Sequence, residues 1–554
     1  MLSRLLLSIF LFGMTLSFAQ SQRPNVVFIL ADDCTKFDLG CYGSPDSKTP
    51  TIDQLAAGGM QFNRCYQAAP MCSPTRHSIF TGLYPARSGA YPNHTYAEDD
   101  VQSVVQYLNP LGYRVGLTGK THIAPKSIFD FEYLDDKHVL IGPETEAFLS
   151  SASENEENFC LFVCSNEPHT PWNQGDPSQF DPVKITLPEM YADLPRIREE
   201  FCKYLAEINY LDGQVKQTLD ALDKYGLREN TVIIFASEQG NSFPFAKWTC
   251  YQAGLGSALI VNWPASIQAG LTSEALVEYT DILPTIIDLA GGEPVDHLDG
   301  QSLLPLLKQE TDTHKSFTYG MQTTRGIING AAYYPIRSVA GDTFRLVWNI
   351  SPEMAFRNVV SEKKWFKEWL NSPDAETRKT ANLYIHRPEF ELYNDVTDPY
   401  NRQNLIDQPE YADKVKALKA ELHRWMEHCG DLGLETELHA DVHKNRGGKG
   451  SSQVKGNAHT VVMGLQASRP SGNLQIEVQG YYSFSTKKDC EVFVDGIQLI
   501  WPTQNSKLAL RRGVIGLETG HHTLEIKSNG PVPQLSWSGP NFQPQVMPQL
   551  ESPE

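Results

Sequence analysis

The sequence predicts an α/β protein with a large central mixed sheet between helices, a small α+β C-terminal subdomain and an appended all-β sandwich. Two apolar runs, Val26–Leu30 and Thr231–Ala236, are uninterrupted by polar residues, as is typical of strands buried on both faces of a sheet. Between them, the segment from Leu194 to Leu222 repeats apolar residues at helical spacing, which predicts a long covering helix. Near the C-terminus, short alternating segments separated by turns indicate an antiparallel sandwich.

The composition and the first residues bound the class of protein. The chain has 554 residues, 41% of them hydrophobic, which suits more than one globular domain. Its net charge of −19 argues against a nucleic-acid partner. Residues 1–19 combine Arg4, an apolar stretch and the small-residue site Ser17-Phe18-Ala19, so we expect a signal peptide and a periplasmic, secreted or lumenal protein. A second apolar run long enough to span a bilayer is missing from the sequence, so we expect no membrane span.

The ten cysteines are scattered and lack paired Cys-x-x-Cys spacing. A zinc site is therefore not expected. Disulfides are compatible with an oxidising compartment, but the spacing does not pair the cysteines.

Oxygen-bearing side chains follow both buried strands. The first strand ends in Asp32 and Asp33, and the second ends in Glu238 and Gln239. Open α/β sheets place ligands at the carboxyl ends of their strands. Taken alone, Asp32-Asp33 fits a capping turn equally well, but two such strands together predict a site for a hard cation, for which calcium is the best match.

Residues Met71–Ser78 have the form Cys-x-Pro-x-Arg and predict a turn that opens a helix. Pro74 suits the first helical position, which places Cys72 at the positive end of the helix dipole and Arg76 on nearly the same face one turn later. Such a site favours an anion. The five-residue pattern by itself is more often a buried cysteine beside a surface arginine.

The longer run from Cys72 to Pro85, CSPTRHSIFTGLYP, closely resembles the signature of the type I sulfatases. Two further motifs match that family, Gly119-Lys120-Thr121-His122 and Pro168-His169-Thr170-Pro171, and the resemblance covers about residues 24–432. It implies an alkaline-phosphatase-like fold, a calcium ion and a sulfated saccharide substrate. It also implies that a formylglycine-generating maturation enzyme oxidises Cys72 to formylglycine, whose hydrate is the nucleophile.

The resemblance assigns roles residue by residue. Lys120 would contact formylglycine and sulfate, and His122 would take the diol proton as sulfate leaves. His169 would protonate the leaving atom, and Lys247 matches a second sulfate-binding lysine. Each histidine alone is more often an ordinary polar residue, and Lys247 alone fits a solvated loop. The implied catalytic set is Cys72, Arg76, Lys120, His122, His169 and Lys247, and the implied metal set is Asp32, Asp33, Cys72, Glu238 and Gln239.

One position departs from the family. Sulfatases usually carry Asp followed by Asn or His where this chain has Glu238-Gln239. Both side chains are longer by one methylene group, which puts the metal geometry in question.

The branch of the family and the domain boundaries are predicted from less specific similarities. Tyr333–Ser338, Phe344–Asn349 and Phe243–Phe245 resemble the heparan N-sulfatase branch. We expect a catalytic subdomain over 20–314, a C-terminal subdomain over 315–438, a polar glycine-rich linker over 439–458 and a β-sandwich over 459–554. Val494–Gly496 and Leu535–Pro540 in this last domain resemble a PA14-type module, where Trp501 and Trp537 suit core packing better than sugar stacking.

The function expected from these features is hydrolysis of sulfate from a glycosaminoglycan or algal-type polysaccharide. Three alternatives remain: an O-sulfatase acting on galactose or hexosamine sulfates, a phosphodiester or phosphonate hydrolase of the same superfamily, and a glycan-binding protein whose catalytic machinery has decayed. Only the Glu238-Gln239 pair favours the last of these.

Overall fold

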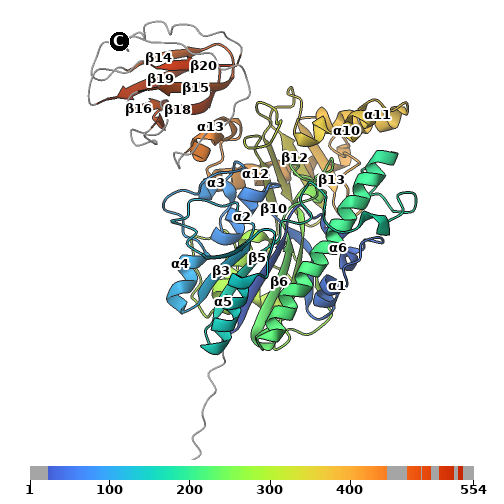
Figure 1. The fold of residues 1–554 in the computed structure, drawn as a ribbon. Helices are drawn as coiled ribbons and strands as arrows, with labels where there is room; N and C mark the ends of the chain where they lie inside the picture. The colour runs from blue at the N-terminus through green and yellow to red at the C-terminus, as the bar shows by residue number, and fades with distance from the viewer. Residues whose placement is uncertain (1–22, 446–470, 488–489, 501–510, 529–534, 541–554) are drawn as a thin grey trace, which may run out of the picture.

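The computed structural model describes residues 23–445, 471–487, 490–500, 511–528 and 535–540 (Figure 1). Its largest part is a nine-stranded sheet in the order β4-β3-β5-β1-β6-β7-β2-β8, with β9 also paired to β2. The strands are β1 (Asn25–Ala31), β2 (Met60–Tyr66), β3 (Arg114–Gly119), β4 (Glu132–Asp136), β5 (Phe159–Cys164), β6 (Thr231–Ser237), β7 (Gly256–Asn262), β8 (Leu271–Ser273) and β9 (Val277–Glu278).

The sheet is mixed, as predicted. β1 pairs in parallel with β5 on one side and β6 on the other, whereas β7 runs antiparallel to both β6 and β2. In the β1–β6 pair Leu30 lies opposite Ala236 and Ala31 opposite Ser237. The two strands therefore end side by side, and the polar residues that follow each of them are delivered to one edge of the sheet.

Every residue of β1 is buried, because both faces of the sheet are covered. Val27 and Ile29 belong to one apolar core, while Val26, Phe28 and Leu30 belong to a second core on the opposite face. This alternation follows the two-residue period of a strand. The uninterrupted apolar run in the sequence is thus a strand with no solvated side.

Helices cover the two faces (Figure 1). The expected long helix is α6 (Pro195–Lys224), whose apolar side joins the core that contains Val27. The remaining helices in residues 23–314 are α1 (Pro50–Ala57), α2 (Cys72–Thr81), α3 (Pro85–Ser88), α4 (Val104–Leu108), α5 (Pro143–Glu154), α7 (Gln252–Leu255), α8 (Ile282–Leu289) and α9 (Leu304–Leu307).

A four-stranded antiparallel sheet forms the smaller α+β unit. Its order is β10 (Thr318–Gln322), β11 (Ile336–Ala340), β12 (Phe344–Asn349) and β13 (Phe390–Asn394). Helix α12 (Ala412–Cys429) packs on it, and Gly430, with φ of 67°, caps the end of this helix in the left-handed conformation. Helices α10 (Lys364–Leu370) and α11 (Ala375–Ile385) complete this unit.

The expected polar linker differs from the structure where the two can be compared. Residues 439–445 belong to helix α13 (Leu434–Asn445), and residues 446–458 lie outside the described residues, as does the expected signal peptide. Buried Leu438 and Ala440 explain the difference, because they give this polar stretch an apolar side that packs against its neighbours.

The C-terminal strands form two antiparallel sheets around one apolar core. One sheet has the order β14 (Ser471–Ile476), β19 (Gly520–Lys527), β16 (Glu491–Val494) and β17 (Ile497–Ile500), and the other has the order β18 (Arg511–Leu517), β15 (Gly480–Thr486) and β20 (Ser536–Ser538). We call this unit the β sandwich. Trp537 is 9% exposed and stacks on Tyr482, as its expected core role requires, and Trp501 lies outside the described residues.

Two further features of the described chain bear on the expectations. All ten cysteines lie in described residues and none is in a disulfide. Within the described ranges, no helix has the length and apolar character needed to cross a membrane.

Candidate active site

Helix α2 places Cys72 at its first residue, with Met71 as the N-cap. The predicted start at Pro74 is therefore two residues too late. Pro74 is instead the third helical residue, where the absent N–H still costs nothing because the first-turn N–H groups have no partner within the helix. Cys72 thus lies at the positive end of the helix dipole, which makes a helix start attractive to anions.

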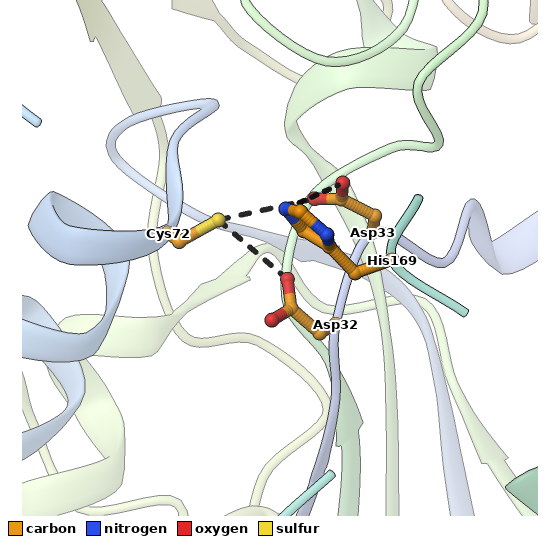
Figure 2. Close-up of side chains that lie close together, drawn as sticks. All are labelled: Asp32, Asp33, Cys72 and His169. Atoms are coloured by element: carbon orange, nitrogen blue, oxygen red, sulfur yellow. Dashed lines mark hydrogen bonds and ion pairs between the residues drawn. The ribbon is translucent and has the colours of Figure 1, made fainter. Parts of the chain in front are cut away.

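Two acidic side chains face the cysteine from the end of β1. The Sγ atom of Cys72 lies 3.5 Å from Oδ1 of Asp32 and 3.9 Å from Oδ1 of Asp33. Figure 2 shows His169 beside the same sulfur, and its Nε2 lies 3.6 Å from Oδ2 of Asp33. One ligand atom from each of these four residues lies within 4.8 Å of the others, so the end of β1 and the start of α2 share one site.

Three cationic side chains lie around the sulfur, of which Arg76 and Lys247 are buried and Lys120 is partly buried. Nζ of Lys247 lies 3.4 Å from Sγ and 2.6 Å from Asp33, and Nζ of Lys120 lies 4.0 Å from Sγ and forms an ion pair with Asp32. Arg76 is fully buried. Arg76 is therefore not a surface arginine, and Lys247 is not a solvated loop lysine. A buried charge is retained only where it has partners.

The second strand delivers its pair to the same point. Nε of Arg76 lies 2.8 Å from Oε1 of Glu238. Nε2 of Gln239 lies 3.0 Å from Sγ of Cys72 and 2.5 Å from Oδ1 of Asp33. The register of β1 and β6 therefore brings both polar pairs to Cys72.

The surrounding charges set the protonation of Cys72. Burial raises the pKa of the thiol, and Asp32 raises it further, but Lys120, Lys247 and a hydrogen bond with His169 outweigh them and lower the pKa to about 5. An unmodified thiol here would be a thiolate. The pocket consequently stabilises negative charge at this side chain.

The pKa values of the two strand-end acids shift in opposite directions. Burial opposes ionisation of Asp32, yet Lys120 and its other partners hold the pKa of Asp32 well below its ordinary value. Burial raises the pKa of Glu238 well above its ordinary value despite Arg76. Burial lowers the pKa of His169, but the carboxylate of Asp33 reverses this and leaves it raised, which favours a histidine that carries a proton to donate.

The residues at the ends of the two strands fit a calcium ion. Oε1 of Gln239 is buried without a hydrogen-bond partner among the described residues, which is costly for a polar oxygen, and Oε1 of Glu238 contacts Nε of Arg76. Carboxylate and amide oxygens are the donors that calcium prefers, whereas the nitrogen of His169 is not. The longer side chains of Glu238 and Gln239 therefore still supply oxygens of the kind that calcium prefers, and the oxygen of Gln239 has no other partner among the described residues.

His122 lies beyond the end of β3 and contacts His94. Strand β3 ends at Gly119 with φ of 90°, so Lys120 and His122 do not alternate along an extended segment. Nε2 of His122 lies 2.6 Å from Nδ1 of His94, and its Nδ1 is buried without a hydrogen-bond partner in the described structure. Burial, followed by Lys120, lowers the pKa of His122 well below its usual value.

Sequence reasoning did not identify Asn93 and His94. Oδ1 of Asn93 accepts a hydrogen bond of 3.4 Å from the backbone N–H of Ser73, the residue after Cys72. His94 contacts His122 as described above. These two residues belong to none of the motifs quoted above, and only the fold brings them to α2.

Comparison with known proteins finds similarity along most of the chain. Residues 24–292 match the sulfatase family, and residues 240–347 match the C-terminal region of N-sulphoglucosamine sulphohydrolase. An ulvan-active sulfatase from Formosa agariphila is 30% identical over 446 residues, which cover 78% of this chain and 86% of that protein. Human N-sulphoglucosamine sulphohydrolase is 27% identical, covering 74% of this chain and 91% of that protein.

A solved structure of a 2-O GAG sulfatase has the same fold. It aligns with a TM-score of 0.56 at 19% identity and covers 74% of this chain and 93% of that one. The protein is thus a hydrolase built on the alkaline-phosphatase-like sulfatase fold. It belongs to the sulfatase family.

Proposed function

We propose that this protein is an exported sulfatase that removes sulfate from a sulfated glycan, using a formylglycine made from Cys72 and a calcium ion. The observation that carries the proposal is the meeting of Lys120, Lys247 and His169 with the side chain of residue 72. The saccharide class rests on the names of the relatives, one an ulvan-active sulfatase and one an N-sulphoglucosamine sulphohydrolase.

The charged groups would bind and orient the sulfate. Lys120 and Lys247 would neutralise its oxygens, aided by the positive end of the α2 dipole. Arg76, which bridges Asp32 and Glu238, would hold the acids in place. The sulfur atom would then lie next to residue 72.

The proposal also requires a calcium ion and the formylglycine form of residue 72. Asp32, Asp33, Glu238 and Gln239, together with residue 72, would hold calcium, which reduces repulsion between sulfate and the nucleophile. Formylglycine, once formed by its maturation enzyme, supplies a diol in which one oxygen can attack sulfur and the other can later expel sulfate.

The histidines would move the protons. As the bond from sulfur to the sugar's oxygen or nitrogen breaks, His169 would donate a proton to that leaving atom. His122 would accept the proton of the second hydroxyl as sulfate departs. The low pKa of His122 suits a group that enters this step without a proton.

The heparan N-sulfatase branch is our best assignment within the family. The match of residues 240–347 to the N-sulphoglucosamine sulphohydrolase C-terminal region supports it. An O-sulfatase acting on galactose or hexosamine sulfates is the alternative, favoured by the ulvan-active relative. Defined saccharides carrying a single N-, 2-O-, 4-O- or 6-O-sulfate, assayed for free sulfate, separate these; release from the N-sulfated compound alone is expected, and release only from an O-sulfated one would exclude the branch.

Sulfate rather than phosphate chemistry is tested with paired esters of one leaving group. We expect faster turnover of the sulfate ester. The described residues around residue 72 form one candidate metal cluster, and in our proposal the formylglycine diol, rather than a second metal ion, provides the nucleophile. Faster turnover of the phosphate ester would favour the phosphodiester or phosphonate hydrolase alternative. No turnover of either by protein converted at residue 72 would favour the glycan-binding alternative.

Export and the domain boundaries are part of the proposal. Export rests on residues 1–19, and cell fractionation of the full chain should find it outside the cytoplasm. We propose the division into 20–314, 315–438 and a sandwich within 459–554, with the helix α13 (Leu434–Asn445) leading into the last unit, whose likeness to PA14 modules stays a prediction.

A further inference from the structure

The segment around Asn93 and His94 touches two parts of the candidate active site. Oδ1 of Asn93 accepts from the N–H of Ser73, at 3.4 Å, and His94 contacts His122 at 2.6 Å. Both His94 and His122 have positive φ, of 58° and 56°, a conformation that the surrounding structure must hold in place. We call Asn93–His94 the active-site corner.

The loop after β10 holds this corner by its backbone. The N–H of Asn93 donates to the carbonyl of Arg325 at 3.1 Å, and Nδ2 of Asn93 donates to the carbonyl of Gly326 at 3.5 Å. Gly326 has φ of 89°, and a Cβ there would lie 2.3 Å from the carbonyl oxygen of Asn93. The corner and the loop are therefore in direct contact, with no room for a side chain between them.

The side chain of Arg325 leads from this loop into the β sandwich. Its guanidinium lies 3.6 Å from the centre of the Tyr481 ring in β15 and forms an ion pair with Asp441 in α13 through Nε at 2.7 Å. Tyr481 also donates from its hydroxyl to the carbonyl of Glu437 at 2.8 Å. A guanidinium stacked on a ring and paired with a carboxylate is fixed in both direction and plane.

Further contacts join α13 to Tyr91 and to the loop after β10. The carboxylate of Glu437 accepts from the N–H of Thr324 at 2.8 Å, and the hydroxyl of Tyr91 donates to the carbonyl of Thr436 at 3.0 Å. In β18, a Cβ on Gly516 would lie 2.6 Å from Cβ of Leu438. The β sandwich thus packs closely against α13, which in turn contacts Tyr91 and the loop after β10.

We propose that Arg325 is a positioning residue through which the β sandwich holds the active-site corner, so that the sandwich completes the active site rather than serving as an independent module. The path runs from Tyr481 to Arg325, then to Asn93 and His94, and ends at Ser73 and His122. The expected effect of this contact on turnover rests on the proposed function, whereas its expected effect on the structure does not.

A matched pair of variants at Tyr481 provides the test, because Tyr481 lies in the β sandwich and outside the proposed catalytic set. Tyr481→Leu removes the ring over Arg325, whereas Tyr481→Phe keeps the ring and loses only the hydroxyl. We expect Tyr481→Leu to lower kcat for sulfate release by about tenfold or more, because misplacement of a catalytic group is costly, with KM within about twofold. Tyr481→Phe should stay within about twofold of the wild type in both.

Hydrogen exchange separates this inference from the proposed function. In the full chain, amides of the peptide spanning residues 86–98 should exchange faster in Tyr481→Leu than in the wild type, and at the wild-type rate in Tyr481→Phe. Unchanged exchange in Tyr481→Leu would overturn the inference even if the wild type is an active sulfatase. Faster exchange together with an inactive wild type would leave the positioning role standing and count against the proposed function.

A second variant guards against misfolding. Arg325→Lys keeps a charge beside Asp441 but lacks the flat guanidinium that stacks on Tyr481. It should show the same two changes to a smaller extent. His521→Ala in β19 is the control for substitution within the sandwich, and effects equal to those of Tyr481→Leu would contradict the specific path.

Discussion

At the scale of single residues, the candidate site depends on charges that compensate one another by direct contact. Lys247 is 4% exposed and Arg76 fully buried, and each contacts a carboxylate that ends a central strand. Removing one partner from such a pair leaves an uncompensated buried charge, which costs about 3–5 kcal/mol. The types of these residues were predictable from motifs, but their burial and mutual distances were not.

Asp38 gives a pH prediction away from the site. Its Oδ2 accepts from the hydroxyl of Tyr204 at 2.9 Å and from Nδ2 of Asn241 at 3.0 Å, yet burial raises its pKa to about 7. The unfolded chain loses this proton near pH 4, so the stability that the group contributes is complete below that pH and is lost as the pH rises to about 7. The loss is on the order of 4 kcal/mol.

Asp38→Asn removes this titration. Its free energy of unfolding should fall less between pH 5 and pH 8 than that of the wild type, because the amide has no proton to lose in this range. Denaturant unfolding at both pH values measures the difference. Exposed Asp223→Asn is the control, and equal falls in the wild type and Asp38→Asn would contradict the assignment.

At the scale of elements, strands and long helices were predictable because their signals are local. The apolar runs around Phe28 and Ile234 give β1 and β6 within one or two residues, and the periodicity of 194–222 gives α6. The start of α2 was misplaced because proline is acceptable anywhere in a first turn. The helical part of the expected linker was missed because its apolar contacts, such as Leu438 against β18, come from distant strands.

The Asn93–His94 corner was missed for the same reason. Its partners are Arg325, more than two hundred residues away, and His122 in another loop. A loop pair of this kind has no periodicity and no fixed spacing to its partners. Only the folded chain identifies it.

The end of β3 gives a prediction at this scale. Gly119 has φ of 90°, and a Cβ there would lie 2.1 Å from the carbonyl oxygen of Cys164. Gly119→Ala should lower the melting temperature strongly and displace Lys120, because it adds a backbone clash to the cost of about 1 kcal/mol for a left-handed residue.

Gly226→Ala is the matched control for this substitution. Gly226 has φ of 66° with nothing within 4 Å of the added Cβ, so it bears the conformational cost alone. Thermal unfolding of both variants should show the larger loss for Gly119→Ala. Equal losses would mean that the close approach to Cys164 is not a constraint.

At the scale of the whole molecule, three units contribute to one site. The central sheet delivers Asp32 and Glu238, and the loop after β10 contacts the active-site corner. The β sandwich reaches that loop through Tyr481. The sequence predicted the units and their order, but the contacts between them depend on residues that no motif marks.

Calcium should stabilise the folded chain as a whole. An ion that binds the folded state alone at a hundred times its Kd adds about 3 kcal/mol to the free energy of unfolding. Melting temperatures measured with excess calcium and with a chelator should therefore differ by several degrees.

Gln239→Leu should reduce this calcium-dependent shift, since Oε1 of Gln239 is one of the unpartnered oxygens. Gln252→Leu is the matched control, because Oε1 of Gln252 is also buried without a hydrogen-bond partner in the described structure but belongs to α7. A shift that is absent in the wild type, or undiminished in Gln239→Leu, would argue against a calcium site at the strand ends.

The state of residue 72 is the point on which the catalytic account depends. Cleavage after Arg64 and Arg76 isolates a tryptic peptide of residues 65–76, which contains Cys72 and, as an internal reference, the buried Cys65 of β2. Mass analysis of this peptide from natively produced, active protein should place an aldehyde at residue 72 and an unchanged thiol at Cys65. A plain thiol at residue 72 in protein that releases sulfate would contradict the account.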